Sequence, residues 1–191
     1  FTFRVTVFAN IWTYSLGDSN NNTAVSFPDA MHGWIVGIGG KLLCTKDGGQ
    51  TWQAQNAATD ANAQLQGVSF ANAFNGCIVG SGGTIRRTGD GGRTWSTPVV
   101  NGLDITQYSL WSVKFINSAT GWIVGDKGLI LKTTDSGNNW SVQASSSDVI
   151  LYGVDFADAN NGWVVGQLGT ILRTTDGGAT WALQRVPDGS S

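Results

Sequence analysis

Short apolar runs recur along the chain in one order, separated by glycine-rich and polar segments. The first kind is a V-x-F segment, in which Val and Phe share one side because side chains alternate between the two faces of a strand. It begins at Val25, Val68, Val113 and Val154. The second kind is an apolar run with Gly at both ends, which is typical of a strand buried on both faces. It begins at Gly33, Gly76, Gly121 and Gly162.

Two further runs complete each repeat. The third carries apolar residues before a Thr, the fourth starts at a Trp, and the turn between them reads T-x-D-[GS]-G-x-[TN]-W. The turn Asp recurs at spacings of 43, 45 and 41 residues. Four short strands in a period of roughly 40 to 45 residues form the blade of a β-propeller. The sequence therefore predicts an all-β propeller within residues 25–191, with four four-stranded blades at about 25–60, 67–98, 112–145 and 153–186.

Hairpin chemistry explains the repeated turn. Its Asp can accept hydrogen bonds from backbone N–H groups, its second Gly suits a positive φ, and its Trp covers the hairpin with a large apolar surface. A catalytic loop would not need four copies, and four carboxylates spread over four blades cannot share one metal ion. The predicted structural residues are Asp47, Gly49, Trp52, Asp90, Gly92, Trp95, Asp135, Gly137, Trp140, Asp176, Gly178 and Trp181.

Composition narrows the classes of function. Charged residues make up 13% of the chain, and a net charge of -2 supplies no basic field for nucleic acid or anionic lipid. The chain has no apolar run long enough to predict a membrane span. It begins at Phe1, and we expect that a leader has been removed and that the protein acts outside the cytoplasm, whether secreted, periplasmic or lumenal. Cys44 and Cys77 are interpreted as two packed thiols, with a disulfide as the alternative.

Candidate catalytic chemistry is sparse. The chain has no Glu, and its single His32 occupies a loop position that Asn or Thr fills in the other repeats. No Ser-His-Asp order, P-loop, Cys/His cluster or dinucleotide fingerprint is present in the sequence. We therefore predict a non-enzymatic protein with no cofactor and no catalytic or metal-binding residues, and keep a glycosidase-like enzyme as a distant third hypothesis.

The turn motif resembles the Asp-box, or BNR, repeat of sialidases, sortilin-type receptors and some glycoside hydrolases. Joined to G-W-[IV]-V-G-x-x-G-x-[IL]-[IL]-[RK]-T, it looks more like the repeat of Ycf48-like photosystem II assembly factors, over residues 25–185. That resemblance implies a β-propeller acting as an assembly chaperone. Ycf48-like proteins resemble seven-bladed propellers, whereas four repeats are present here. The chain could close as a small ring, be a fragment, or form an arc completed by another chain.

The resemblance also implies a basic residue just before the hairpin Thr. Arg87, Lys132 and Arg173 fit, Cys44 takes that place in the first repeat, and Arg86 adds one charge. These four basic residues are candidates for partner binding, and the alternative is that they are edge residues with solvated heads.

The connectors between repeats vary in length and composition, whereas the loops on the side of the Asp-box turns are short and alike. Variable loops on a repeated scaffold often carry function. Tyr108, Trp111 and Tyr152 lie at the ends of the connectors, just before the first strand, and could anchor a protein or glycan partner. The alternative is that they wedge between neighbouring blades.

Residues 1–24 break the repeat. Residues 1–12 alternate between apolar and polar side chains, as in a strand with one buried face, and a polar linker follows. Asn21 is a candidate glycosylation site in an N-x-T sequon. A surplus strand could pack in cis or join a neighbouring subunit. Two functions therefore remain open: a protein-binding or assembly module, and an extracellular structural subunit that self-assembles through its N-terminal strand, with a filament as one outcome.

Overall fold

The computed structural model describes residues 21–57, 59 and 63–185, and the regular structure there consists of β-strands and two short 3-10 turns. The predicted N-terminal strand lies outside the described residues. Each of the four predicted repeats forms one sheet, here called blades 1 to 4, and the strands within a repeat pair antiparallel in chain order. The all-β prediction and the four repeats are confirmed.

The V-x-F segments form the first strand of each blade, and the Gly-bounded runs form the second. Blade 1 begins earlier than expected, at Asn22, so the end of the predicted linker belongs to its first strand. The strands of blades 1 and 2 are β1 (Asn22–Ser26), β2 (Gly33–Gly37), β3 (Leu42–Thr45), β4 (Gln53–Ala54), β5 (Leu65–Phe70), β6 (Gly76–Gly80) and β7 (Ile85–Thr88).

Blades 3 and 4 repeat the same order and add a short 3-10 turn after their second strands. Their strands are β9 (Leu110–Phe115), β10 (Gly121–Gly125), β11 (Ile130–Thr133), β12 (Asn139–Gln143), β13 (Leu151–Phe156), β14 (Gly162–Gly166), β15 (Ile171–Thr174) and β16 (Ala182–Leu183). The 3-10 turns are η1 (Asp126–Gly128) and η2 (Gln167–Gly169).

The outer edges of blades 2 and 3 depart from the plain repeat. The expected fourth strand of blade 2 is reduced to an isolated bridge between Arg87 and Ser96. Pro98 follows closely and has no N–H group to extend that ladder. The chain instead continues as β8 (Val99–Asn101), which pairs in parallel with β12 of blade 3. Blade 3 therefore has five strands, one of them supplied by the segment that leaves blade 2.

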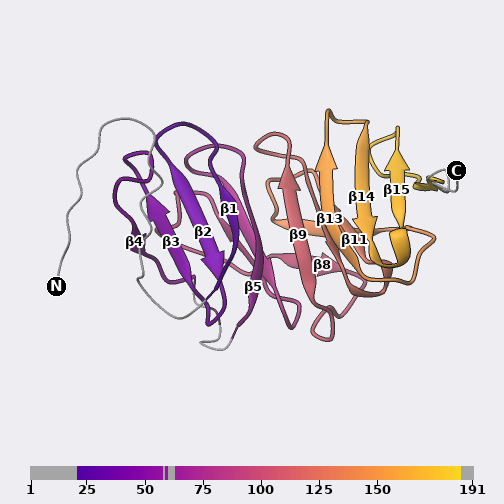
Figure 1. The fold of residues 1–191 in the computed structure, drawn as a ribbon, viewed down its shortest axis with the longest axis horizontal. Helices are drawn as coiled ribbons and strands as arrows, with labels where there is room; N and C mark the ends of the chain where they lie inside the picture. Colours follow the sequence, from indigo (N-terminus) through magenta and orange to yellow (C-terminus); the bar gives the residue numbers. More distant parts are fainter. Residues whose placement is uncertain (1–20, 58, 60–62, 186–191) are drawn as a thin grey trace, which may run out of the picture.

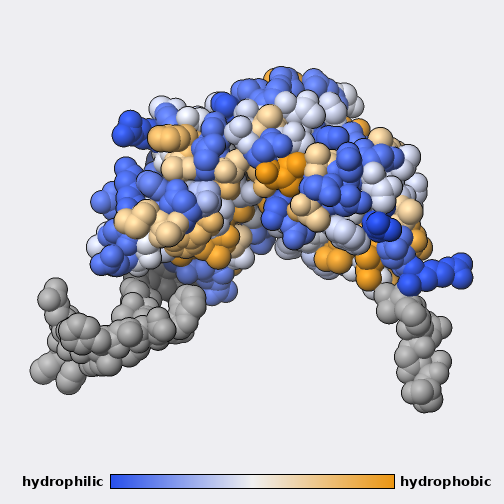
Figure 2. Space-filling model, turned by 90° about the horizontal axis from the view of Figure 1, so that it is seen from above, coloured by the Kyte–Doolittle hydropathy of each residue, from blue (hydrophilic) through white to orange (hydrophobic). Residues whose placement is uncertain are grey.

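The blades stand side by side along an arc (Figures 1 and 2). Their first strands contact one another in sequence, β1 with β5, β5 with β9 and β9 with β13, so these strands line the concave side. Figure 2 shows the first and last blades at separate ends of the arc, so the four described blades do not close a ring.

Three hydrophobic clusters lie between the blades, one at each junction. Residues of the second strand alternate between the two neighbours: Ile123 packs toward blade 2, whereas Trp122 and Val124 pack toward blade 4. The Phe of the V-x-F segment in blades 2 and 4 meets the second-strand Trp of the preceding blade, whereas Cys77 takes the place of that Trp in blade 2. Phe70 stacks on Trp34 and Phe156 on Trp122, each with ring centroids 3.5 Å apart. The two thiols, Cys44 and Cys77, are buried and free, as predicted.

Candidate partner-binding site

The Asp-box turns fold as the sequence predicts. In blade 2, Thr88 donates its hydroxyl proton to Asp90 Oδ1 over 2.8 Å, and Thr94 donates to Oδ2 over 2.6 Å. The backbone N–H of Thr94 also donates to Oδ1. Gly92 has φ +83°, the left-handed conformation expected for this position. The same contacts recur in the other blades, with Asn139 replacing the second Thr in blade 3.

These hydrogen bonds stabilise the ionised carboxylates. The hydroxyl and backbone donors lower the pKa of Asp47, Asp90 and Asp176 to about 2, and the side-chain amide of Asn139 lowers that of Asp135. Each carboxylate is therefore charged and already occupied by its own turn. Over the part of the chain that the structure describes, no group of three or more His, Cys or Asp side chains is placed to hold a metal ion.

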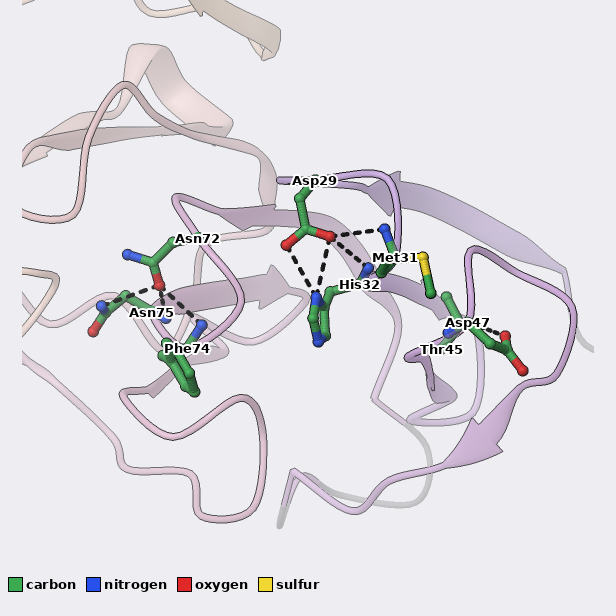
Figure 3. A network of polar contacts seen from close by, with 8 residues as sticks. All are labelled: Asp29, Met31, His32, Thr45, Asp47, Asn72, Phe74 and Asn75. Atoms are coloured by element: carbon green, nitrogen blue, oxygen red, sulfur yellow. Dashed lines mark hydrogen bonds and ion pairs between the residues drawn. The ribbon is translucent and has the colours of Figure 1, made fainter.

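The loops between first and second strands are closed in the same way (Figure 3). Asp29 Oδ1 accepts the backbone N–H groups of Met31 and His32, each at 2.8 Å, and the His32 ring lies 3.0 Å from Oδ2. Asn72 does the same in blade 2, accepting from Phe74 and Asn75 at 2.9 Å. His32 thus lies in a loop, where the sequence placed it, against a carboxylate that caps that loop.

The predicted basic residues link one blade to the next. Arg87 Nε donates to the Ser136 carbonyl of blade 3, and Lys132 Nζ donates to the Gly177 carbonyl of blade 4, both over 2.7 Å. In blade 1, where Cys44 replaces the basic residue, Gln55 donates to the Gly91 carbonyl of blade 2 over 3.2 Å. All three acceptors directly follow the Asp of an Asp-box. Sequence reasoning missed Gln55, because it directly follows the fourth strand, whereas Arg87 and Lys132 lie on the third.

The other two basic candidates are placed differently. Arg173, at the equivalent position of blade 4, is exposed and stands over the Trp163 ring at 5.7 Å. Arg86 faces the opposite side of β7 and donates to the Ile85 carbonyl. The structure therefore does not gather Arg86, Arg87, Lys132 and Arg173 into one patch; they are spread over three blades.

A β-bulge recurs near the start of the first strand of every blade. The ladder register skips one residue there, between Asn22 and Ala24, Leu65 and Gly67, Leu110 and Ser112, and Leu151 and Gly153. Bulges are often found beside functional sites because they redirect a side chain. The four bulged residues, here called the bulge row, are Thr23, Gln66, Trp111 and Tyr152.

The bulge row is where otherwise similar blades differ. Its residues lie on the strands of the concave side, at the end away from the Asp-box turns. Thr23 donates its hydroxyl proton to the Leu65 carbonyl, a contact inside the scaffold. Gln66 and Trp111 are half-buried and Tyr152 is exposed. The sequence analysis placed Trp111 and Tyr152 before the first strand; that boundary is wrong, because the strands begin at Leu110 and Leu151.

The two aromatic residues of the bulge row form a pair. Their ring centroids are 5.5 Å apart and nearly perpendicular, so the pair bridges blades 3 and 4. Asp126 orients Trp111: its Oδ1 accepts the indole N–H over 2.8 Å, and its Oδ2 accepts the Ser109 N–H. From η1 itself, the Lys127 ammonium stands over the Tyr108 ring at 5.3 Å. The Trp111 and Tyr152 rings contact each other across the two blades, and Tyr152 keeps exposed surface. That they bind a partner stays a prediction.

The concave side beyond this pair is polar. Lys114 of β9 and Asp155 of β13 form an ion pair of 2.7 Å between neighbouring first strands. Ser26 and Ser69 occupy the same position in blades 1 and 2, where each hydroxyl accepts a backbone N–H from the next blade. The aromatic pair, the adjacent cation and this polar wall together can contact a polypeptide through stacking, hydrogen bonds and charge.

The family profile described as photosynthesis system II assembly factor YCF48 matches residues 6–73, 58–148 and 141–191. The chain belongs to the YCF48 family. The Photosystem II assembly protein Ycf48 of Thermosynechococcus vestitus (strain NIES-2133 / IAM M-273 / BP-1) is 47% identical over 36 residues, which are 19% of this chain and 10% of that protein.

Solved structures agree with this assignment. A structure of YCF48 bound to D1 peptide matches with a TM-score of 0.75 at 26% identity, over 92% of this chain and 56% of that one. YCF48 from Cyanidioschyzon merolae matches with a TM-score of 0.72 at 20% identity, over 92% of this chain and 59% of that one. The chain thus spans little more than half the length of these YCF48 chains. The Ycf48-like resemblance and the propeller architecture are confirmed.

Proposed function

We propose that this chain is a non-enzymatic binding module that holds an extended segment of another protein, as an assembly factor does, and that it works outside the cytoplasm. The observation that carries the proposal is the bulge row, and within it the Trp111–Tyr152 pair. The scaffold residues around it repeat from blade to blade, whereas these four positions carry four different side chains. Because the blades share one scaffold and differ at these four positions, we assign the positions to recognition of a partner rather than to stability of the fold.

The pair has the chemistry of a binding anchor. Trp and Tyr contribute large contact areas with few rotatable bonds, and they dominate the binding free energy of many interfaces. Trp111 is held by Asp126 before any partner arrives, so little conformational entropy is lost on binding. The nearby Lys127 would favour a partner segment with an acidic side chain or a terminal carboxylate. Membership of the YCF48 family supports a protein as the partner, with a glycan as the alternative that the same aromatics would suit.

The proposed function also includes a location outside the cytoplasm. Across the described residues, no helix combines the length and the hydrophobicity needed for a membrane crossing. We place the protein outside the cytoplasm because of its resemblance to Ycf48-like factors, and we keep Asn21 as a candidate glycosylation site there. Asn21 is exposed at the start of blade 1, while the sequon hydroxyl of Thr23 donates to backbone carbonyls.

The D1 peptide of the related structure is the first probe to use, because that relative is the one with a ligand of stated class. We expect the intact chain to bind it and Trp111→Ala/Tyr152→Ala to bind at least tenfold more weakly, a loss of about 1.4 kcal/mol or more. Phe74→Ala is the matched control, since Phe74 is an exposed aromatic on the opposite end of a blade. Equal binding by both variants, measured by calorimetry, would remove the pair from the site.

A further inference from the structure

A hollow of about 180 Å³ lies between blades 1 and 2, at the end that carries the Asp-box turns. Each of the two blades lines it with the loop before its second strand and with its Asp-box turn. Figure 3 shows two of the lining residues, His32 and Phe74, on these neighbouring loops. Because a cavity of about 150 Å³ holds benzene, the hollow has room for one ring-sized group.

The hollow occupies the place that a basic side chain fills between blades 3 and 4. There the Lys132 ammonium donates to the Gly177 carbonyl over 2.7 Å. The equivalent residues between blades 1 and 2 are Cys44 and Gly91, and Gly91 lines the hollow. The Cys44 side chain ends one atom beyond Cβ, so it leaves open the space that a longer side chain would fill.

The wall of the hollow is also less completely hydrogen-bonded than its counterpart. The Trp34 indole nitrogen and Gln55 Oε1 both belong to lining residues and are buried without a hydrogen-bond partner among the described residues. The Trp122 indole, which is equivalent to that of Trp34, donates to the Gly177 carbonyl. The Gln55 amide therefore replaces the missing basic side chain only in part.

Four side chains around the hollow depart from the pattern of the repeat. Lys46 stands where the other turns have Gly or Thr, and Arg93 stands where they have Gln, Asn or Ala. His32 replaces Asn or Thr, and Phe74 replaces Met, Ala or Asn. The four come from separate segments of two blades and line one hollow. The repeat does not account for this convergence, since it would place neutral side chains at the three basic positions.

The charges around the hollow favour an anion. Lys46 of blade 1 and Arg93 of blade 2 are exposed, and neither forms an ion pair within the part of the chain that the structure describes. The His32 ring beside them is held by Asp29. The carboxylate in the wall, that of Asp90, already accepts the hydroxyl protons of its own turn. An ammonium and a guanidinium are thus available, and both bind carboxylates strongly.

We propose that this hollow binds a small organic anion, in which a carboxylate is joined to one apolar ring. The carboxylate pairs with Lys46 and Arg93, and the ring enters the hollow against Phe74, whose side chain is 63% exposed. Pockets for drug-sized ligands measure about 300–1,000 Å³, so this smaller hollow suits a free molecule with a single ring. The site lies at the opposite end of the blades from the bulge row and does not depend on it.

Three probes added to the unaltered chain test the chemistry of the ligand. Benzoate has both the charge and the ring, benzamide replaces the charge with a neutral amide, and acetate lacks the ring. In titrations followed by ligand-observed NMR, benzoate should bind at millimolar concentrations and at least about tenfold more tightly than either other probe. Absence of benzoate binding, or equal binding of benzamide or acetate, would overturn the proposal.

Variants test the location of the site. Lys46→Ala/Arg93→Ala should weaken benzoate binding by about tenfold or more, whereas Arg173→Ala, which removes an exposed Arg of blade 4, should leave it unchanged. Phe74→Ala should weaken benzoate binding and spare that of the D1 peptide, so the two proposed sites are tested apart. Near-ultraviolet circular dichroism verifies that each variant remains folded.

Cys44→Lys provides a test that keeps every lining residue. It restores the basic side chain of the repeat, which should fill the hollow and abolish benzoate binding. If this variant does not fold, the double variant at the exposed Lys46 and Arg93 still decides the question. Benzoate binding that persists in the double variant, or in a folded Cys44→Lys protein, would contradict the proposed site.

Discussion

At the scale of single residues, one position of the Asp-box turn has a left-handed backbone conformation that favours Gly. The residue after each Asp-box Asp has a positive φ, and three of the four are Gly: Gly48, Gly91 and Gly177. The fourth is Ser136, with φ +66°. A residue with a Cβ is strained in this region by about 1–2 kcal/mol. The strain at Ser136 persists because its carbonyl is fixed by Arg87.

Ser136→Gly should therefore stabilise the protein. Release of the strain outweighs the extra entropy of Gly in the unfolded chain, and we expect a gain of about 0.5–1 kcal/mol in the free energy of unfolding. Urea denaturation measures it. Gly91→Ser is the reverse control: it has φ +72°, and a Cβ there would lie 2.9 Å from the Ala73 carbonyl oxygen, so stability should fall.

At the scale of the element, the Asp-box hairpin depends on the charge of one carboxylate. The ordinary pKa of Asp is 3.8, and in the folded protein it is lowered to about 2 in three of the turns. A carboxyl whose pKa is lowered by folding stabilises the fold while ionised. That stabilisation is fully present above pH 3.8 and is lost as the pH falls toward 2.

We therefore expect the protein to lose stability steeply between about pH 4 and pH 2, since four turns titrate in the same direction. Asp90→Asn should lower stability at neutral pH, because its amide nitrogen cannot accept the Thr94 hydroxyl proton. The same variant should show a shallower loss in acid, with one titrating group fewer. Urea midpoints measured across this pH range test both statements, and parallel curves for the two proteins would contradict the second.

Most of the strands and turns could be predicted from the sequence, whereas the remaining features depend on contacts between blades. The V-x-F segment, the Gly-bounded run and the Asp-box each have a local signature, so their strands and turns were predicted. The bulges were missed, although an apolar residue three positions before Val68, Val113 or Val154 is a signal for them. The pairing of β8 with β12 has no local signature, because a parallel partner is chosen by tertiary packing. For the same reason the roles of Arg87 and Lys132 became visible only with the next blade in place.

At the scale of the whole molecule, the blades form a linear array in which each one contacts its neighbours. The stability of such an array depends on the repeats and on the interfaces between adjacent repeats. Blades 2 and 3 have two such interfaces and blades 1 and 4 have one. Whether the array closes depends on the rotation from blade to blade, a quantity summed over all junctions. For this reason the sequence left three alternatives: a small closed ring, a fragment, or an arc completed by another chain.

This arrangement predicts how the blades open. Amide hydrogens of β2 and β14, in the two end blades, should exchange faster than those of β6 and β10. Each lost interface leaves a sheet face in water, so we expect a difference of at least tenfold in exchange rate. Hydrogen exchange followed by mass spectrometry measures it, and uniform protection of all four blades would contradict the prediction.

The passage of β8 from the end of blade 2 to the edge of blade 3 affects how this chain can be divided. A cut between these two blades would separate a strand from the sheet it completes, whereas the described residues of the connectors before Leu65 and before Leu151 form no such shared strand. Blades 2 and 3 should thus be treated as one unit when the chain is engineered. Insertions, circular permutations or blade exchanges should respect that pair, although the sequence repeats with the period of a single blade.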